Sequence, residues 1–508
     1  MKKEKKEKKI KKEKKVKNGK SNRFSGFIKL MLSNRTQTFI LAAMLIAIFV
    51  FINLAVQEID LAQIDFTENQ VYTLTDTSKK AIQDVNQDVK MYFYGFSERD
   101  TRIDLAKQYG RANSKISYEI LTNESNPTKV AEYELTDGYQ IVIVETADNH
   151  QLINASTEFV TYDYTTYATI DTTEQTLTNA ILNLTMENKP KVYLLQGHNE
   201  YTENDLVVLQ TYIKNEVYEF ASINLVTVDS VPEDCSVLVI MDPTSDFLDS
   251  DVEKIQAYIN RGGDIFFAKD LEQTAPNYPN IQKILDMYGV AVENGCVLEA
   301  DSTKVAANFP TAFIPAVDPS HDITKEIYTD GQLLLYSAGR LKIKDEETLA
   351  SMNVTETDLI TSSEESYFIS DLTGSIQVSN GEQGQSVIGA YFVKSLSENK
   401  EALEEETDSN TSKLVIVANA QFVSSKALSN LSQNTPLALY GQNKDFILNT
   451  LAYMSKRDNL ISVRKDTQTT TYTPTEQEDL AVRIIIFAVP ITIIVAGCLV
   501  WRHRKRKK

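Results

Sequence analysis

The amino-acid sequence predicts an α/β protein in which extracytoplasmic mixed α/β domains, one of them doubly wound, are flanked by two transmembrane helices. Two uncharged apolar segments, Phe39–Val56 and Ile484–Trp501, lie near the two ends of the chain. Between them, short apolar runs alternate with amphipathic stretches, as expected for strands that alternate with helices. Basic residues cluster on the terminal side of each apolar segment.

Each apolar segment is long enough to span a membrane. Both contain 18 residues, which corresponds to about 27 Å of helix and matches the hydrocarbon layer of a bilayer. Because lysine and arginine stay on the cytoplasmic side, both termini are expected in the cytoplasm and residues 57–482 outside. A cleavable signal peptide fits less well, since Gln57–Asp60 offers no site with small residues.

The predicted topology separates the charges of the chain. Residues 1–37 carry a net charge of +12 and residues 502–508 carry +6; subtracting these and Arg483 from the total of −18 leaves −37 for residues 57–482. A strongly acidic body repels nucleic acid and anionic lipid, so proteins, cations or neutral sugars are its expected partners. The basic tails are interpreted as solvated topogenic segments, with attraction to an anionic inner leaflet as the alternative.

The expected organisation follows from these segments and from composition. It comprises a basic cytoplasmic tail (1–37), the first transmembrane helix (38–56), a mixed α/β extracytoplasmic domain (57–187), a doubly wound α/β domain (188–300), a β-rich region with a closing strand and helix (301–465), a polar linker (466–482), the second transmembrane helix (483–501) and a basic cytoplasmic tail (502–508). Pro190 marks the boundary at 188, because a helix cannot continue through it.

In the first external domain, local patterns predict alternating helices and strands. Helices are expected at Thr73–Val85, Ile103–Ala112 and Glu174–Met186, with Thr75 or Asp76 as the first N-cap, and strands at Val89–Tyr94, Ser117–Leu121, Tyr139–Glu145 and Glu158–Asp163.

The next domain has the clearest pattern in the chain. Strands are expected at Lys191–Leu195, Ser222–Val228, Ser236–Met241 and Ile265–Ala268, and helices at Asp205–Tyr218 and Leu248–Asn260. Strands that alternate with helices through short turns imply a doubly wound parallel sheet. Further on, Val297–Lys413 is β-rich and irregular, and a buried strand at Leu414–Ala418 and a helix at Asp445–Met454 close the region.

Polar residues follow two of the predicted parallel strands. His198, Asn199 and Glu200 come after the first strand, and Asp242 ends the third. Ligands of doubly wound sheets bind beyond the carboxyl ends of the strands, so these residues are the candidate binding site. The alternative interpretation is that they only cap the turns and helices that follow.

The residues alone give little support for catalysis, a metal or a cofactor. The chain lacks a G-x-x-x-x-G-K-[ST] phosphate loop, so it is not expected to be an ATPase. His150, His198 and His321 are too scattered for a zinc pattern, and Cys235 and Cys296 are too few for a disulfide framework, although they could bond to each other. A hydrolase that uses His198 and Glu200, and a calcium site in the acidic loop Lys400–Asn410, are the weaker alternatives.

Three blocks of sequence resemble a known family. The run DFTENQVYTLT at Asp65–Thr75 resembles the motif that follows the first span in the Gldg family, the auxiliary proteins of ABC transporters first known from gliding motility. The run VYLLQGHNE at Val192–Glu200 is similar to the strand and "GHGE" turn of that family, with Asn199 in place of glycine. Leu414–Val423, followed by Asn443–Asn449 and Leu460–Arg464, resembles the closing block.

The resemblance implies an auxiliary subunit in the cell membrane that is not itself an enzyme. Its partners would be an ABC permease, a separate ATPase and an unknown extracytoplasmic partner or cargo. The resemblance also implies that the middle domain has a glutamine-amidotransferase-like (flavodoxin-like) fold without the catalytic cysteine, in line with Cys235 preceding a strand instead of ending one. The alternative is an extracytoplasmic sensor of ligands or cell-envelope glycans that works without a transporter.

Overall fold

The computed structural model describes residues 73–162, 169–274, 277–330, 332–374, 376–396, 410–427 and 435–456. The predicted spans Phe39–Val56 and Ile484–Trp501, the two basic tails, the polar linker and nearly all of the acidic loop Lys400–Asn410 lie outside these residues. Within the described ranges, no helix combines the length and the apolar character that a membrane crossing requires.

The first region, residues 73–186, is a small α/β layer structure built on one sheet. Its elements are α3 (Asp76–Ala81), β1 (Val89–Tyr94), α4 (Thr101–Ala112), β2 (Ile116–Leu121), α5 (Pro127–Glu132), β3 (Ile141–Glu145), β4 (His150–Asn154), α6 (Ala155–Glu158), β5 (Val160–Tyr162), β6 (Thr169–Asp171) and α7 (Thr173–Thr185). The main sheet has the order β2-β1-β3-β4, in which β1 and β2 are parallel and the other pairs antiparallel.

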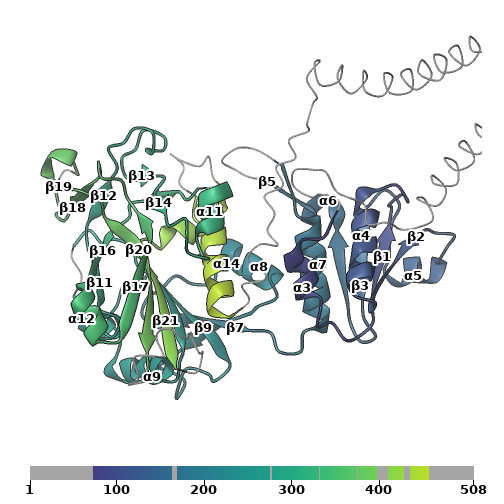
Figure 1. Ribbon diagram of the computed structural model, residues 1–508, viewed down its shortest axis with the longest axis horizontal. Helices are drawn as coiled ribbons and strands as arrows, with labels where there is room; N and C mark the ends of the chain where they lie inside the picture. Colours follow the sequence, from purple (N-terminus) through teal and green to yellow (C-terminus); the bar gives the residue numbers. More distant parts are fainter. Residues whose placement is uncertain are drawn as a thin grey trace, which may run out of the picture. The chain divides into compact units, whose positions relative to one another are not determined.

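The core of this region lies between the sheet and its helices (Figure 1). On the side of α4 and α7, Tyr109 and Ile181 pack against Met91 and Phe93 of β1. The opposite side carries a smaller cluster around Tyr92 and the other aromatic residues of that face. Apolar side chains recur at helical spacing in α4 and α7, and each helix therefore packs an apolar face against the sheet.

The sequence predicts most elements of this region closely. The expected strand Val89–Tyr94 coincides with β1, and the expected helices near α4 and α7 differ by one or two residues at their ends. Thr75 is the N-cap of α3, as expected, because its hydroxyl accepts a hydrogen bond from the Ser78 backbone at 3.0 Å. The expectation of a helix over Thr73–Val85 is wrong in its length, since α3 ends at Ala81 and turns follow.

The second region, residues 187–456, contains a large mixed sheet. Its elements are β7 (Lys191–Gln196), α8 (Val207–Asn215), β8 (Glu219–Asn224), β9 (Cys235–Met241), α9 (Asp249–Asn260), β10 (Asp264–Ala268), α10 (Pro279–Leu285), β11 (Val290–Glu293), β12 (Cys296–Leu298), β13 (Ala312–Phe313), β14 (Ala316–Val317), α11 (Lys325–Asp330), β15 (Leu335–Tyr336), β16 (Arg340–Ile343), α12 (Glu346–Ser351), β17 (Val354–Thr361), β18 (Tyr367–Ile369), η1 (Val378–Asn380), β19 (Glu382–Gln383), β20 (Val387–Ser395), β21 (Thr411–Val417), η3 (Gln421–Val423), η4 (Leu437–Leu439) and α14 (Asn443–Met454).

The sheet has the order β14-β17-β20-β21-β10-β9-β7-β8. The five strands β8, β7, β9, β10 and β21 are parallel, and their order is the 2-1-3-4-5 order of one common doubly wound sheet. Strands β20, β17 and β14 continue the sheet in antiparallel fashion, so it joins strands from residues 188–300 with strands from 301–465.

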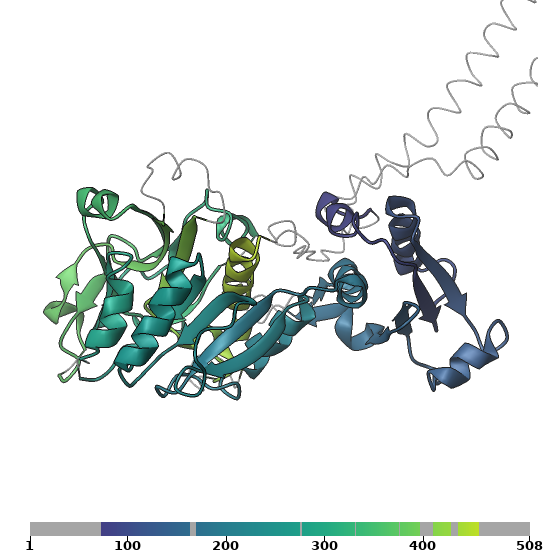
Figure 2. The same ribbon diagram turned by 90° about the horizontal axis from the view of Figure 1, so that it is seen from below.

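Helices cover both faces of the parallel part (Figures 1 and 2). On one face, α8 and α14 bury Ile213 and Phe446 against Val192 and Val239. On the other face, α9 and α10 bury residues such as Ile255 against Ile240. Because the inner parallel strands β9, β10 and β21 are buried on both sides, they contain continuous apolar runs, which is the signal that the sequence analysis used, whereas the edge strand β8 is largely exposed.

One strand of this sheet is misplaced by the sequence analysis. The expected strand Ser222–Val228 is β8, Glu219–Asn224, which begins and ends earlier. Pairing with β7 sets these limits, since Lys191 lies opposite Glu219 and Gln196 opposite Asn224. At the end of β8, the Asn224 side chain accepts a hydrogen bond from the Val226 backbone at 2.9 Å. The chain therefore turns where the sequence analysis expected the strand to continue.

Candidate functional site

The candidate site lies where the strand order of the parallel sheet reverses. Strand β8 lies on one side of β7 and β9 on the other, so the turns after β7 and β9 meet at a switch point. The two turns are joined directly: the His198 carbonyl accepts hydrogen bonds from Thr244 at 3.1 Å and from Ser245 at 3.0 Å, and the Tyr201 backbone donates to Met241 at 2.8 Å. The topology therefore brings His198, Asn199 and Glu200 beside Asp242.

His198 lies between two carboxylates inside the protein. Its Nδ1 is 3.5 Å from Glu200 Oε1, and its Nε2 is 3.1 Å from Asp251 Oδ2 in the first turn of α9. The side chains of Glu200 and Asp251 have no exposed surface, and that of His198 is 5% exposed. The ring also packs edge-on against Phe247 at 4.9 Å between centroids.

These surroundings favour the charged form of the imidazole. The Glu200 carboxylate beside Nδ1 raises the pKa of His198, burial opposes this rise, and the charge of Asp251 adds to it. Both ring nitrogens of an imidazolium are donors, so each faces an acceptor here. An imidazolium held in this way joins the turn after β7 to α9 and has no free nitrogen to act as a base, which favours a structural role.

Asn199 differs from its two neighbours because its side chain is exposed. Its amide donates to Ser245 Oγ at 2.7 Å. Its backbone φ is +59°, in the left-handed region, and asparagine is the residue other than glycine that adopts this conformation most readily. The backbone therefore explains why asparagine can stand at the position where the similar "GHGE" turn has glycine.

Asp242 belongs to a second cluster of charges beyond β9 and β10. Its Oδ1 lies 2.8 Å from Lys269 Nζ, and Lys269 Nζ lies 2.8 Å from Glu272 Oε1. The same Asp242 oxygen accepts from the Asp270 backbone at 3.1 Å. The φ of Asp242 is +51°, an uncommon conformation for a residue other than glycine, and these hydrogen bonds hold it in place.

Asp270 connects β10 to the segment that follows β21. Its Oδ1 accepts backbone hydrogen bonds from Ala420 at 2.6 Å and Gln421 at 3.0 Å, and its Oδ2 accepts from the Tyr201 hydroxyl at 2.6 Å. Burial, and then the charge of Asp242, raise the pKa of Asp270. The pKa of Tyr201 is raised as well, chiefly by burial and then by the charge of Asp270.

The structure therefore divides the four predicted residues between two neighbouring clusters. His198 and Glu200 form one with Asp251, and Asp242 forms the other with Lys269 and Asp270. Sequence reasoning missed Asp251, Lys269 and Asp270. Lys269 and Asp270 could have been found, because they follow the expected strand Ile265–Ala268 directly, as Asp242 follows β9.

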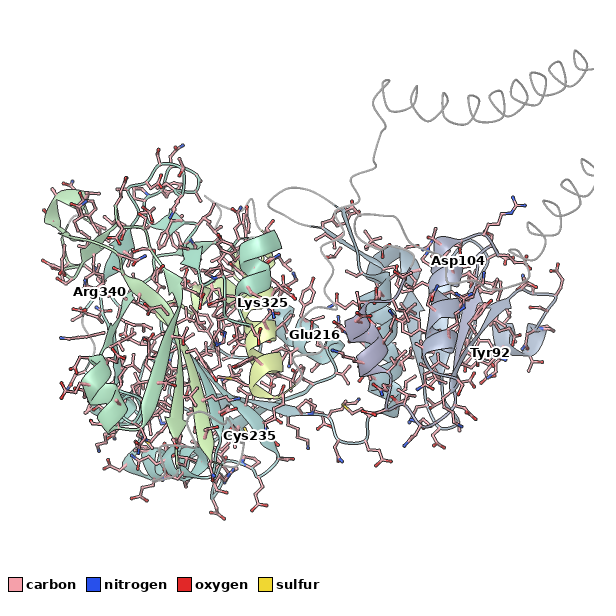
Figure 3. All side chains as sticks on the ribbon, in the orientation of Figure 1. Tyr92, Asp104, Glu216, Cys235, Lys325 and Arg340 are labelled. Atoms are coloured by element: carbon pink, nitrogen blue, oxygen red, sulfur yellow. The ribbon has the colours of Figure 1, made fainter. Side chains whose placement is uncertain are left out.

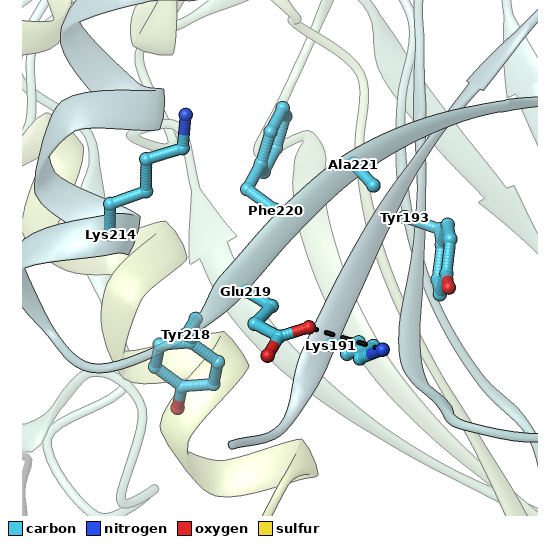
Figure 4. Close-up of a pocket in the computed structure, with 7 residues that line it drawn as sticks. All are labelled: Lys191, Tyr193, Lys214, Tyr218, Glu219, Phe220 and Ala221. Carbon is cyan, nitrogen blue, oxygen red and sulfur yellow. Dashed lines mark ion pairs between the residues drawn. The ribbon is translucent and has the colours of Figure 1, made fainter. Parts of the chain in front are cut away.

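Two hollows lie at opposite ends of the parallel strands. One has a volume of about 360 Å³ and lies at the amino ends of β7 and β8, where Lys191 is paired with Glu219 at 3.1 Å (Figure 4). The other has a volume of about 300 Å³ and lies beyond the carboxyl end of β10, next to Lys269 and Asp270. The second is the better candidate, since ligands of such sheets bind at the carboxyl ends of strands.

The two cysteines outside the predicted spans are free thiols. Cys235, which is labelled in Figure 3, is the first residue of β9, and its Sγ lies 3.4 Å from the Tyr258 hydroxyl. Burial raises the pKa of Cys235 and of Cys296 to about 12. Both thiols are therefore protonated at neutral pH and poor nucleophiles.

Among the described residues, no group of three or more His, Cys, Asp or Glu side chains is placed to hold a metal ion.

A family model described as an ABC-type uncharacterized transport system matches residues 189–450, slightly more than half of the chain. Among solved structures, the "mmIFT52 N-terminal domain" is similar at 15% identity over 52% of this chain and 97% of that one, with a TM-score of 0.35. The exo-beta-1,4-mannosidase Op5Man5 from Opitutaceae bacterium strain TAV5 is similar at 9% identity over 63% of this chain and 44% of that one, with a TM-score of 0.25. Both TM-scores are too low to indicate a shared fold. The sequence matches no curated protein.

Proposed function

The chain belongs to the ABC-type uncharacterized transport system family, and from this premise we propose that it is a non-catalytic auxiliary subunit of an ABC transporter. Its external domains couple the permease to an extracytoplasmic partner or cargo, and a separate subunit hydrolyses ATP. One observation carries the proposal: the family match, residues 189–450, nearly coincides with the region from β7 to α14, Lys191–Met454. The match therefore covers nearly the whole of the region that contains the large mixed sheet.

The proposal includes an anchor at each end of the external body. The apolar segments Phe39–Val56 and Ile484–Trp501, with their flanking basic residues, support a two-pass protein of the cell membrane with both termini in the cytoplasm. Two spans are too few to form a transport pathway, which is why a multi-span permease is part of the proposal.

The absence of catalysis is also part of the proposal, and the candidate site supports it. His198 is paired on both ring nitrogens, and the Cys235 thiol is at the start of a strand with its pKa raised by burial. A nucleophile in a fold of this type stands at a sharp turn after a strand. The parallel strand order supports the further proposal that the domain is glutamine-amidotransferase-like without its nucleophile.

Co-purification tests the proposed assembly. The full chain, tagged at its C-terminus, is isolated from its native membrane in a mild detergent, and co-purifying proteins are identified by mass spectrometry. We expect a multi-span permease and an ATPase in stoichiometric amounts. Recovery of the chain without both subunits would contradict the proposal and favour a sensor of ligands or cell-envelope glycans that works alone.

A matched variant tests whether the spans hold the complex together. Ala43, Ala47 and Gly497 are small residues that allow close helix approach in a membrane. Replacing all three with leucine keeps the segments apolar, so insertion should persist while recovery of the permease falls. Unchanged recovery would assign the association to the external domains.

Cysteine labelling tests the topology. Ser302 and Ser397 lie in the part proposed to be external. Each is replaced by cysteine, and we expect both to react with a membrane-impermeant maleimide in intact cells, whereas a cysteine placed in residues 1–37 should react only after lysis. Protection of either position in intact cells contradicts the topology.

A further inference from the structure

The cavity of about 300 Å³ beyond β10 has the size and the lining of a small-molecule site. Its wall comes from the segment after β10, from α10 and from β11. One part of it is apolar, with Phe267, Leu271, Ile281 and Val292 together with the ring of Tyr278. This lining would take up a compact apolar or aromatic body.

Two buried charged residues, Lys269 and Asp270, also line the cavity. The Lys269 ammonium is already neutralised, since it lies 2.8 Å from both Asp242 and Glu272. Asp270 keeps its place by accepting hydrogen bonds from Ala420, Gln421 and Tyr201. Lys269 therefore offers little attraction to an anionic ligand.

The second basic group near the cavity, Arg340, is paired in the same way. Its Nε lies 2.8 Å from Glu293, its Nη2 lies 3.0 Å from Glu382, and its guanidinium stacks over Phe368. The cavity wall, the partners of Lys269 and the Arg340 guanidinium thus combine two basic side chains with four carboxylates, those of Asp242, Asp270, Glu272 and Glu293. The formal balance is −2, so the cavity disfavours anions and attracts cations.

Glu293 is the carboxylate best placed to meet a cation in the cavity. It lines the wall, its side chain is 34% exposed, and its Oε2 accepts from Arg340. Its Oε1 accepts no hydrogen bond from the described part of the chain. Burial and then the hydrogen bond to Glu272 raise the pKa of Tyr278 to about 12, which agrees with negative charge at this wall.

We propose that this cavity binds a small ligand whose apolar or aromatic body carries a primary ammonium group. The body packs on the apolar wall and the ring of Tyr278, and the ammonium donates to Glu293. Such hydrogen bonds between charged groups are shorter and stronger than neutral ones. The proposal rests on the cavity alone and holds whether or not the chain assembles with a permease.

Isothermal titration of the full-length protein in detergent tests the proposal with matched probes. Phenethylamine carries the ammonium, phenethyl alcohol is its neutral counterpart, and phenylacetate is an anion of similar size. We expect phenethylamine to bind with an affinity about millimolar or tighter, as a ligand of this size allows. The alcohol should bind about tenfold more weakly, because it lacks the charge-assisted hydrogen bond, and phenylacetate should not bind.

Two variants locate the binding, each of which changes one of the two carboxylates that pair with Arg340. Glu293→Gln keeps an acceptor for Arg340 but removes the charge that lines the cavity, and it should weaken phenethylamine about tenfold. Glu382→Gln changes the other carboxylate of Arg340, which does not line the cavity, and should leave the affinity unchanged. Equal effects of the two variants would overturn the assignment to Glu293.

A third variant, Val292→Phe, fills part of the cavity and should abolish binding. Thermal melting checks that each variant is folded. The proposal fails if phenethylamine does not bind the native protein, if it binds no better than phenethyl alcohol, or if a folded Val292→Phe variant binds it as well as the native protein does.

Discussion

Replacement of His198 with alanine removes the imidazole that lies between the buried carboxylates of Glu200 and Asp251. The side chains of both acids have no exposed surface, and in the described structure the imidazole is the cation that faces both. The replacement leaves two negative charges close together without that cation. It also removes the edge-on contact of the ring with Phe247.

The size of the effect follows from these losses. Removal of one partner from a buried ion pair costs about 3–5 kcal/mol, because the remaining charge stays buried and unpaired. Loss of an aromatic contact adds about 0.5–1.5 kcal/mol. We therefore expect the region from β7 to α14 to lose about 5 kcal/mol of stability, equivalent to a fall of about 10–20 °C in the melting temperature of a region of this size.

Differential scanning calorimetry of the full chain in detergent measures the shift, and hydrogen exchange of peptides from β7 and α9 assigns it to this region. Asn199→Gly is the matched control, since it changes an exposed side chain of the same turn and glycine suits the φ of +59°. The control should lose less than about 1 kcal/mol. If His198→Ala is no more destabilising than the control, the imidazole does not stabilise the two carboxylates and the reasoning is wrong.

The same interaction predicts a dependence on pH. The carboxylates of Glu200 and Asp251 beside the ring raise the pKa of His198 in the folded protein. The contribution of the imidazolium is therefore fully present below the unfolded pKa of about 6.5 and is lost as the pH rises through the folded pKa. The difference in stability between the native protein and His198→Ala should thus be larger near pH 6 than near pH 9. A difference that grows with pH would contradict this.

Three further predictions concern the interior. Asn443→Ala should lower the free energy of unfolding by about 3 kcal/mol or more, because the buried amide accepts from the Leu334 backbone and donates to the carbonyls of Leu334, Phe422 and Leu437. Urea unfolding measures this loss, and a change below about 1 kcal/mol would show that water replaces these hydrogen bonds. Gly263→Ala should cost about 1–3 kcal/mol, since a Cβ would meet the buried ring of Tyr258 at 2.4 Å; calorimetry checks it, and an unchanged melting temperature would contradict it. Cys235 and Cys296 should resist iodoacetamide at about pH 8, because burial raises both thiol pKa values to about 12; peptide mass spectrometry would refute this by finding either thiol alkylated before unfolding.

The sequence by itself determined the mixed α/β character, most strands and helices, and the edge of the sheet where polar residues gather. These features depend on residues that are close in the chain. Strand β1 was predicted to the residue because Val89–Tyr94 has the alternating pattern of a strand, and the turn at Val192–Glu200 was recognised because its residues are contiguous. The predicted spans and tails lie outside the described residues and remain predictions.

Only the tertiary structure decided how the candidate site is built. Asp270 accepts hydrogen bonds from Ala420 and Gln421, which are 150 and 151 residues further on. His198 stands in a turn that could have been open to solvent, but Asp251 and Phe247 bury it. The ends of β8 likewise depend on its register with β7. Local patterns reveal which residues tend to be buried, whereas some partners of a buried charge are known only when distant segments pack. Asp251 faces His198 from α9, and Asp242 faces Lys269 from the end of β9, because burial of a charge requires counter-charges wherever the fold supplies them.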